Sequence, residues 1–280
     1  MKIGITGQKG VIGGSVTNAL LDESHDVHSL DDYTLSKTFN EFDREELPDD
    51  LNWVLHFGAS TSIEKSIKNP FLTYNNNFNA TLQALKIAHN HSAGFIFMSS
   101  YVYGNPEYIP IDEQHPIRSS NPYMGSKIIC EKICLQLSAQ FNIPLIILRG
   151  FNIYGDQIVK GRLISDLLYA VRNNNPLIIN DPNPKRDYLY IKDFVLLIRK
   201  IISLESPKEG IYNVGYGESY SNLEVAEIIK ELSKNNLELL IRSNPRPNDI
   251  IDCTVDTTLI NNTFSWKPIY SLRDGLSELV

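Results

Sequence analysis

The chain has 280 residues, of which 42% are hydrophobic and 21% charged, and its formal net charge is −7. This length can bury a sizeable core in one large domain or two unequal lobes, and the composition is that of an ordinary globular protein. The acidic balance argues against a nucleic-acid partner, and the absence of any apolar run of spanning length argues against a membrane partner.

The amino terminus goes straight into an apolar segment, and no basic-then-apolar signal pattern precedes it. The three cysteines, Cys130, Cys134 and Cys253, form no metal-type cluster, so we predict no metal site. Cys130 and Cys134 lie one helical turn apart and are expected to pack as small apolar residues. A reducing, cytoplasmic location is the expectation.

Strands and helices alternate along the first 150 residues. Apolar runs predict strands at residues 1–6, 26–30, 53–57, 94–99 and 145–148. Helices are predicted up to residue 21, from about 70 to 89, and from 122 to about 141. This alternation is typical of a doubly wound parallel sheet covered on both faces, an α/β fold. The polar segment 33–50 is short, so the strand expected within it is degenerate or very brief.

Three glycines, Gly7, Gly10 and Gly13, lie where the first strand turns into the first helix. Glycines there permit a tight turn and let backbone N–H groups approach a pyrophosphate at the positive end of the helix. Asp31 follows the second strand, where the hydroxyls of a ribose need an acceptor. Its carboxylate would repel a 2′-phosphate, which favours NAD. Lys9 indicates the opposite, because a cation in this loop could bind the 2′-phosphate of NADP. NADP is therefore the alternative.

After Gly150 the alternation of predicted strands and helices becomes less regular, and prolines occur at residues 182 and 184. We therefore predict a Rossmann-type cofactor domain formed by residues 1–155 with parts of 186–216. A smaller C-terminal α/β substrate lobe would contain residues 156–185 and 217–280.

The segment around Tyr123 carries a pattern with a chemical use. Asn121 is a good helix N-cap and Pro122 suits the first helical position. A helix starting there puts Tyr123 and Lys127 one turn apart on one face. A nearby lysine ammonium favours the phenolate and brings the tyrosine within range of acid–base work. An ordinary amphipathic helix that happens to carry both residues is the alternative.

Taken together, the motifs of this sequence resemble those of extended short-chain dehydrogenases/reductases of the NAD-dependent epimerase/dehydratase family, which modify nucleotide sugars. The resemblance covers nearly the whole chain. The motifs, in order, are the glycine loop, residues 56–59, residues 99–104, Tyr123-x-x-x-Lys127, and residues 149–155, 186–193, 212–215 and 246–249.

The resemblance implies a role for each motif. Tyr123 would be the acid/base on a sugar hydroxyl or ketone, Lys127 would hold the nicotinamide ribose, and Ser99 would bond the reacting oxygen. The implied cofactor site consists of Gly7, Gly10, Val11, Ile12, Gly13, Asp31, Asp32, Phe57, Ala59, Ser60, Asn77, Tyr123 and Lys127. The implied substrate site consists of Ser100, Asn152, Arg186, Arg246 and Asp249.

Simpler alternatives exist for single residues. Ser99 also fits a strand-end serine that satisfies the backbone. Asn77 also fits a surface turn, because it ends a local run of three asparagines. Each arginine alone also fits a surface charge or a structural ion pair.

Departures from the family's motifs reduce the number of reactions that the chain is expected to catalyse. Dehydratases of the family place an Asp-Glu pair directly after the Ser/Thr, and sugar-acid decarboxylases usually keep the glutamate. Here Ser100 and Tyr101 stand at those positions, which disfavours both reactions.

The expected function is therefore epimerisation at C4 of a nucleotide-diphosphate hexose, by transient hydride abstraction to NAD and return. The alternatives are an NAD(P)H-dependent nucleotide 4-keto-6-deoxysugar reductase and a non-catalytic nucleotide-binding regulator.

A homodimer is also expected. The helices around residues 79–89 and 126–141 carry apolar residues on more than one side, which usually requires a second burial surface. In relatives these helices form an intermolecular four-helix bundle. The apolar residues include Leu82, Leu85, Ile128, Ile129, Ile133 and Leu137.

Overall fold

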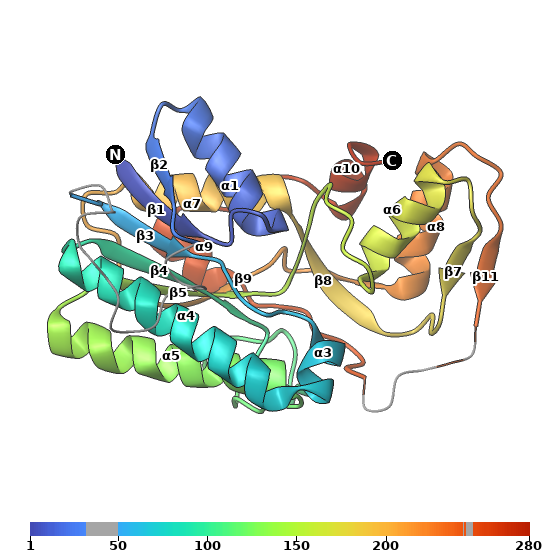
Figure 1. Cartoon of the computed structure of the whole chain (residues 1–280). Helices are drawn as coiled ribbons and strands as arrows, with labels where there is room; N and C mark the ends of the chain where they lie inside the picture. Colours follow the sequence, from blue (N-terminus) through green and yellow to red (C-terminus); the bar gives the residue numbers. More distant parts are fainter. Residues whose placement is uncertain (32–49, 243, 245–248) are drawn as a thin grey trace. The chain divides into compact units, whose positions relative to one another are not determined.

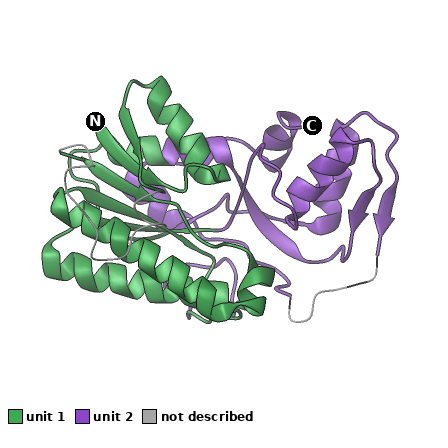
Figure 2. Ribbon diagram, in the orientation of Figure 1, with its two compact units in different colours: residues 1–104, 117–150, 198–212 green, residues 105–116, 151–197, 213–280 purple. Residues whose placement is uncertain are grey.

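The computed structural model of the chain describes residues 1–31, 50–242, 244 and 249–280. It divides into two compact units (Figure 2). Unit 1 contains residues 1–104, 117–150 and 198–212, and unit 2 contains residues 105–116, 151–197 and 213–280.

Unit 1 is built on a six-stranded sheet with the strand order β2-β1-β3-β4-β5-β9 (Figure 1). The pairs β2–β1, β1–β3, β3–β4 and β4–β5 are all parallel. The strands are β1 (Lys2–Thr6), β2 (Asp26–Ser29), β3 (Trp53–His56), β4 (Gly94–Ser100), β5 (Leu145–Gly150) and β9 (Gly210–Val214).

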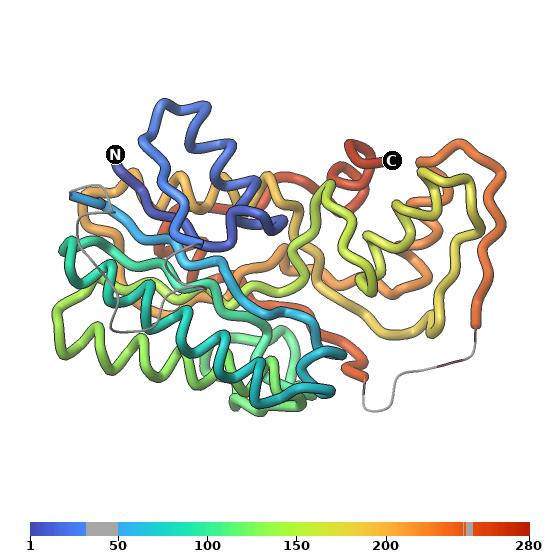
Figure 3. The backbone as a smooth tube through the Cα atoms, viewed as in Figure 1, coloured from blue at the N-terminus to red at the C-terminus, as the bar shows by residue number. Residues whose placement is uncertain are grey.

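Helices cover this sheet on both faces. The two long helices α4 and α5 run alongside each other on one face, and α1 covers the other (Figures 1 and 3). The carboxyl-terminal part of α7 lies beside α1, where Arg199 Nη2 donates to Ala19 O at 3.1 Å. The helices are α1 (Val11–Asp22), α3 (Ile63–Lys68), α4 (Pro70–Asn90), α5 (Pro122–Phe141) and α7 (Ile191–Ile202), the last with residues in both units.

The predicted α/β fold is confirmed. Strands β3, β4 and β5 are buried nearly throughout, as continuous apolar runs in a two-sided parallel sheet should be. Cys130 and Cys134 are fully buried in the core between α5 and the sheet, so they pack as small apolar residues as expected. The strand expected within residues 33–50 lies outside the described residues, apart from Asp50.

The predicted start and end of α5 are confirmed as well. Asn121 Oδ1 accepts a hydrogen bond from Met124 N at 3.0 Å, and Pro122 occupies the first turn. The helix runs to Phe141 and ends at Asn142, which has a left-handed conformation at φ 54°. Its N–H donates to Ser138 O, which is how a helix is normally closed.

Unit 2 contains a three-stranded sheet of order β10-β8-β6 and a two-stranded sheet of β11 and β7. Its strands are β6 (Asn152–Tyr154), β7 (Leu177–Ile179), β8 (Lys185–Tyr190), β10 (Ser219–Ser221) and β11 (Leu239–Ile241). Its helices, besides the start of α7, are α6 (Leu163–Arg172), α8 (Asn222–Leu232), α9 (Thr258–Phe264) and α10 (Leu272–Ser277). Within the described part of the chain, no helix is long and apolar enough to span a membrane.

A buried carboxylate ties together three segments of unit 2. Asp187 on β8 accepts backbone hydrogen bonds from Tyr216 N at 2.6 Å, Gly217 N at 2.8 Å and Val255 N at 3.3 Å. Burial raises the pKa of this carboxyl to about 7, while the three N–H donors act in the opposite direction. Asp187 therefore has a structural role, since its oxygens are committed to the backbone.

Candidate active site

The glycine loop has the shape that an anion site requires. Gly7 has φ +76°, and Gly10 N donates to Gly7 O at 2.9 Å, closing the turn between β1 and α1. A Cβ at Gly13 would lie 2.1 Å from Gly7 O, so only glycine fits there. Gly10 is the N-cap of α1 and makes no side-chain capping bond. Val11 and Ile12 lie in the first turn of α1. The N–H groups of a first turn form the positive end of a helix, which stabilises a pyrophosphate.

Asp31 lies against this loop. Its carboxylate accepts hydrogen bonds from Gly7 N at 2.5 Å and from Gln8 N at 3.2 Å. The acid at the end of β2 is thus held beside the glycine turn, and its role as a ribose acceptor stays a prediction. Lys9 in the same loop is exposed, and Asp32 lies outside the described residues.

His56 at the end of β3 is the centre of a buried neutral network. Gly58 N donates to Thr6 Oγ1 at 2.9 Å, and Thr6 Oγ1 lies 2.7 Å from His56 Nδ1. On the other side, His56 Nε2 lies 3.1 Å from Thr81 Oγ1, which donates to Asn77 O at 2.8 Å. Because each threonine has one proton, this order assigns the proton of the imidazole to Nε2.

The environment of His56 keeps it uncharged. Complete burial, followed by the nearby Lys127 ammonium, lowers the pKa of His56 to about 3. The network therefore joins β1, β3 and α4 without any charge, and it holds the backbone of the loop that follows β3.

That loop carries Phe57, Ala59 and Ser60, and Asn77 fastens it to two helices. Asn77 Oδ1 accepts from Ser60 N at 2.7 Å, and its Nδ2 donates to Ser60 O at 3.3 Å and to Ser126 Oγ at 2.8 Å. Asn77 lies inside α4 and is only 2% exposed. The alternative that places Asn77 in a surface turn is wrong, because its amide is consumed by buried partners.

Tyr123 and Lys127 lie one turn apart at the start of α5, as predicted. Lys127 is 3% exposed, its Nζ donates to Met98 O at 2.8 Å, and it lies 4.6 Å from the centroid of the Phe97 ring. Burial lowers the pKa of Lys127. Tyr123 itself is partly buried.

Ser99 lies near the end of β4 and has an acidic partner. Its Oγ donates to Glu131 Oε1 at 2.5 Å. Arg149 on β5 grips the same carboxylate, with Nη2 2.7 Å from Oε2 and Nε 3.0 Å from Oε1, and its Nη1 donates to Tyr103 Oη at 3.0 Å. We call Ser99, Tyr103, Glu131 and Arg149 the Glu131 cluster, and all four are buried.

The two residues after Ser99 carry no carboxylate. Ser100 is partly buried, and Tyr101 turns its hydroxyl onto Gly104 O at 2.5 Å. Tyr101 is thus part of the packing of the loop after β4.

The predicted substrate residues that the structure describes in unit 2 are joined to one another and to the backbone. Arg186 Nη2 lies 2.7 Å from Asp249 Oδ1, and its Nη1 donates to Ile250 O at 2.6 Å. Asn152 Nδ2 donates to Asp187 O at 3.0 Å. Arg246 lies outside the described residues.

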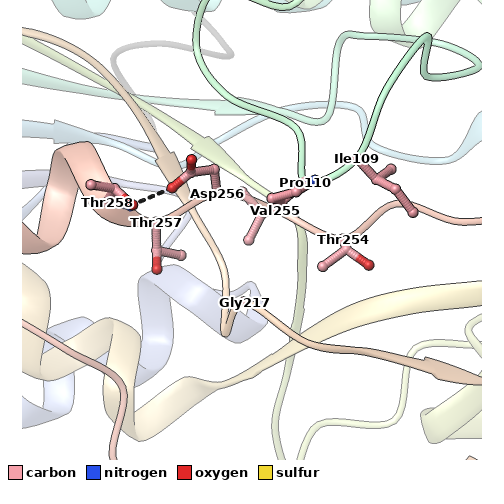
Figure 4. A pocket seen from close by; sticks show the side chains of 8 residues that line it. All are labelled: Ile109, Pro110, Gly217, Thr254, Val255, Asp256, Thr257 and Thr258. Atoms are coloured by element: carbon pink, nitrogen blue, oxygen red, sulfur yellow. Dashed lines mark hydrogen bonds between the residues drawn. The ribbon is translucent and has the colours of Figure 1, made fainter.

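Unit 2 also contains an open hollow of about 620 Å³ (Figure 4). The described residues that line it include none of the predicted substrate residues. They are Ile109, Pro110, Gly217, Thr254, Val255, Asp256, Thr257 and Thr258. Over residues 1–31, 50–242, 244 and 249–280, no three His, Cys, Asp or Glu side chains are grouped as a metal site would need.

The sequence pattern alone gives no individual role to His56, Glu131 or Arg149. A signal for Glu131 was present, because it follows Lys127 by four residues, as Lys127 follows Tyr123, and so shares their helix face. For His56 and Arg149, the positions inside family motifs were visible, but their partners come from distant segments.

The glycine loop, the acid after β2 and the tyrosine and lysine of α5 define a class of nucleotide-cofactor enzymes built on a parallel sheet. The chain belongs to the NAD dependent epimerase/dehydratase family, whose model matches residues 3–215.

Individual relatives are similar along nearly their whole length. The chain is 28% identical to a putative UDP-glucose 4-epimerase of Methanocaldococcus jannaschii, over 99% of this chain and 96% of the relative. It is 27% identical to the UDP-glucose 4-epimerase of Lactobacillus helveticus, over 99% and 94%. Its fold matches that of a UDP-N-acetylglucosamine 4-epimerase from Methanobrevibacter ruminantium with a TM-score of 0.89 and 24% identity, over 99% and 96%.

Proposed function

We propose that this protein is an NAD-dependent nucleotide-sugar epimerase acting at C4 of the hexose. The observation that carries the proposal is the placement of Tyr123 and Lys127 on one face of α5 in a family member whose Ser99 is followed by no acid. This set can move a proton and support hydride chemistry at a secondary alcohol. It lacks the acid–base pair that elimination of water requires.

The glycine loop and Asp31 fit the dinucleotide. The missing side chain at Gly13 lets the glycine turn pack directly against the start of α1, whose first N–H groups suit a pyrophosphate, and the Asp31 carboxylate suits an unphosphorylated ribose. When bound, NAD supplies the acceptor, and then the donor, of the C4 hydride. Gly7, Gly10, Val11, Ile12, Phe57, Ala59, Ser60 and Asn77 would line this site with Tyr123 and Lys127.

The protein's own residues handle the proton. Tyr123 Oη takes the proton of the C4 hydroxyl as the alcohol is oxidised, and it returns the proton after the ketone has turned over. Lys127 is buried beside Phe97, so the charge of its ammonium form acts through little intervening solvent and favours the phenolate. Ser99 and Ser100 hold the reacting sugar.

The nucleotide diphosphate would be held by Arg186, Arg246, Asn152 and Asp249. The ion pair of Arg186 with Asp249 supports this, because it fixes the orientation of the guanidinium group. The Nε–H and one N–H of Nη2 make none of these bonds and can donate to a diphosphate. Relatives named for UDP-sugars favour this class of substrate.

An NAD(P)H-dependent reductase of 4-keto sugars is the second candidate, and the exposed Lys9 in the glycine loop is the observation that favours it. The test incubates purified protein with a panel of UDP-, dTDP- and GDP-hexoses without added cofactor and identifies the products by NMR. Retained NAD and inversion at C4 are expected. An empty site, with absorbance at 340 nm lost only when NAD(P)H and a 4-keto sugar are supplied, would contradict the epimerase.

We also infer a cytoplasmic homodimer that pairs α4 and α5 with their two-fold copies. The support is the exposure of apolar side chains along α5, where Ile129 and Leu135 are each 44% exposed. Leu82, Ile128, Ile133 and Leu137 are partly exposed, whereas Leu85 is buried in the core. Three unpaired cysteines agree with a reducing compartment. Light scattering at micromolar concentration tests the assembly, and a monomer mass would contradict it.

A further inference from the structure

The start of α5, which carries Tyr123, is held by α4 at two adjacent positions. A Cβ at Gly125 would lie 2.1 Å from Tyr74 Oη, so the absence of a side chain there lets α4 pack directly on this part of α5. The next residue, Ser126, is 1% exposed, and its Oγ lies 2.8 Å from Asn77 Nδ2. Both contacts come from α4, so the start of α5 is fixed against this helix.

The direction of each side-chain hydrogen bond in this contact is determined. The Ser60 N–H can only donate, so the atom of Asn77 that faces it at 2.7 Å must be Oδ1. Asn77 Nδ2 then gives its two protons to Ser60 O at 3.3 Å and to Ser126 Oγ at 2.8 Å. Ser126 therefore accepts from Asn77, and its one proton goes to Tyr123 O at 2.7 Å, which can only accept. We call this path from Ser60 through Asn77 and Ser126 to Tyr123 O the Ser126 bridge.

The Ser126 bridge does more than a serine hydroxyl inside a helix usually does. Such a hydroxyl commonly bonds the carbonyl three or four residues back in its own helix. Here the same oxygen also accepts from Asn77 on a second helix. Without Ser126 Oγ, one Nδ2 proton of Asn77 would be left buried without a partner, which is costly. The hydroxyl thus joins the start of α5 to α4 and, through Asn77, to the loop after β3.

We propose that Ser126 is a positioning residue, which holds the phenol of Tyr123 at a fixed place relative to the loop after β3. The inference rests on the proposed function, in which Phe57, Ala59 and Ser60 of this loop line the cofactor site. The hydride leaves C4 toward the cofactor while the proton of the C4 hydroxyl leaves toward Tyr123, so the two acceptors must keep their places relative to each other. A misplacement of about 1 Å can cost about 10²-fold in rate.

Two serines of α5 offer a matched kinetic comparison. Ser126→Ala removes the bridge, whereas Ser138→Ala removes a hydroxyl that is also buried on α5 but bonds to no residue that the structure describes. We expect Ser126→Ala to lower kcat about 10-fold with little change in the KM of the nucleotide sugar, because Tyr123 is displaced while the substrate residues of unit 2 are untouched. Ser138→Ala should leave kcat unchanged.

A second background shows whether Ser126 acts through Tyr123. In Tyr123→Phe there is no phenol to position, so adding Ser126→Ala should change kcat by less than about 2-fold. The same loss in both backgrounds would mean that Ser126 merely supports the fold, and that result would overturn the proposal. An unaltered kcat in Ser126→Ala alone would overturn it too.

Hydrogen exchange measured by NMR tests the Ser126 bridge without any assay of activity. The Ser60 amide is held by Asn77, which loses one of its anchors in Ser126→Ala. We expect this amide to exchange about 10-fold faster in Ser126→Ala and at the wild-type rate in Ser138→Ala, after correction for global stability by urea unfolding. An unchanged Ser60 rate in Ser126→Ala would overturn the proposal, whether the protein epimerises, reduces or only binds a nucleotide sugar.

Discussion

Two buried polar clusters support the candidate active site of unit 1, and they are built on opposite principles. The cluster around His56 contains no charge, and each hydroxyl and ring nitrogen has one determined direction of donation. The Glu131 cluster depends on a buried ion pair. The neutral cluster holds the loop that follows β3, whereas the charged one holds Ser99. The first is vulnerable to acid, and the second is vulnerable to the loss of one partner.

Acidification should break the neutral cluster first, with the largest effect. The pKa of His56 is about 3 in the folded protein and 6.5 in a free histidine, so the unfolded chain binds the proton more readily. This contribution to the free energy of unfolding is complete above pH 6.5 and is lost as pH falls to about 3. It amounts to about 4–5 kcal/mol in all, of which about 2 kcal/mol is lost by pH 5.

Urea unfolding of wild type and His56→Gln between pH 7.5 and 5 measures this loss. The variant should be less stable at pH 7.5 and should lose about 2 kcal/mol less than wild type on going to pH 5. Equal losses in the two proteins would show that other groups account for the acid sensitivity.

Removing one partner should break the charged cluster. Arg149→Met leaves Glu131 buried without its cation, and we expect the free energy of unfolding to fall by about 3–5 kcal/mol. Replacing both residues, as Glu131→Leu with Arg149→Met, should bring the protein to within about 1 kcal/mol of wild type. A double variant as unstable as the single one would mean that shape, and not charge, determines the cost.

Removing the phenol oxygen should separate the chemistry from both clusters. Tyr123→Phe takes away the proton-transfer group, so kcat should fall by about 10²-fold or more. Retained NAD and the urea midpoint should stay at their wild-type values. A near-normal kcat would remove Tyr123 from the mechanism.

The smallest effect is expected at the acid beside the glycine loop. Asp31→Ala should weaken NAD binding by about 10-fold, because a charge-assisted hydrogen bond to the ribose is lost, and it should reduce the preference for NAD over NADP. Asp31→Asn keeps one acceptor oxygen and should retain part of the affinity. Fluorescence titration with both cofactors measures this, and a wild type that already prefers NADP would show that Lys9 decides the choice.

Local signals in the sequence predicted most of unit 1. The start of α5 follows from Asn121 and Pro122, and the turn before α1 follows from three spaced glycines, since each of these residues acts on its own backbone. The pairing of Tyr123 with Lys127 follows from helical periodicity alone.

The hydrogen-bond partners of Ser99 and Asn77 could not be predicted from local sequence signals. Ser99 was expected to satisfy either a substrate or the backbone, yet its partner is a carboxylate 32 residues further on. Asn77 stands in an asparagine run that suggests a surface turn, but α4 buries it against Ser60 and Ser126. The spacing of residues along the chain does not predict contacts between residues so far apart in the sequence.

By itself, then, the sequence determined the parallel sheet, the glycine loop, the placement of Tyr123 and Lys127, and the absence of an acid after Ser99. These depend on interactions within a few residues and on apolar periodicity. Only the tertiary structure decided that Glu131 and Arg149 hold Ser99 and that His56 is held uncharged. Those properties arise from burial and from hydrogen bonds between strands and helices, and they exist only once distant segments are packed together.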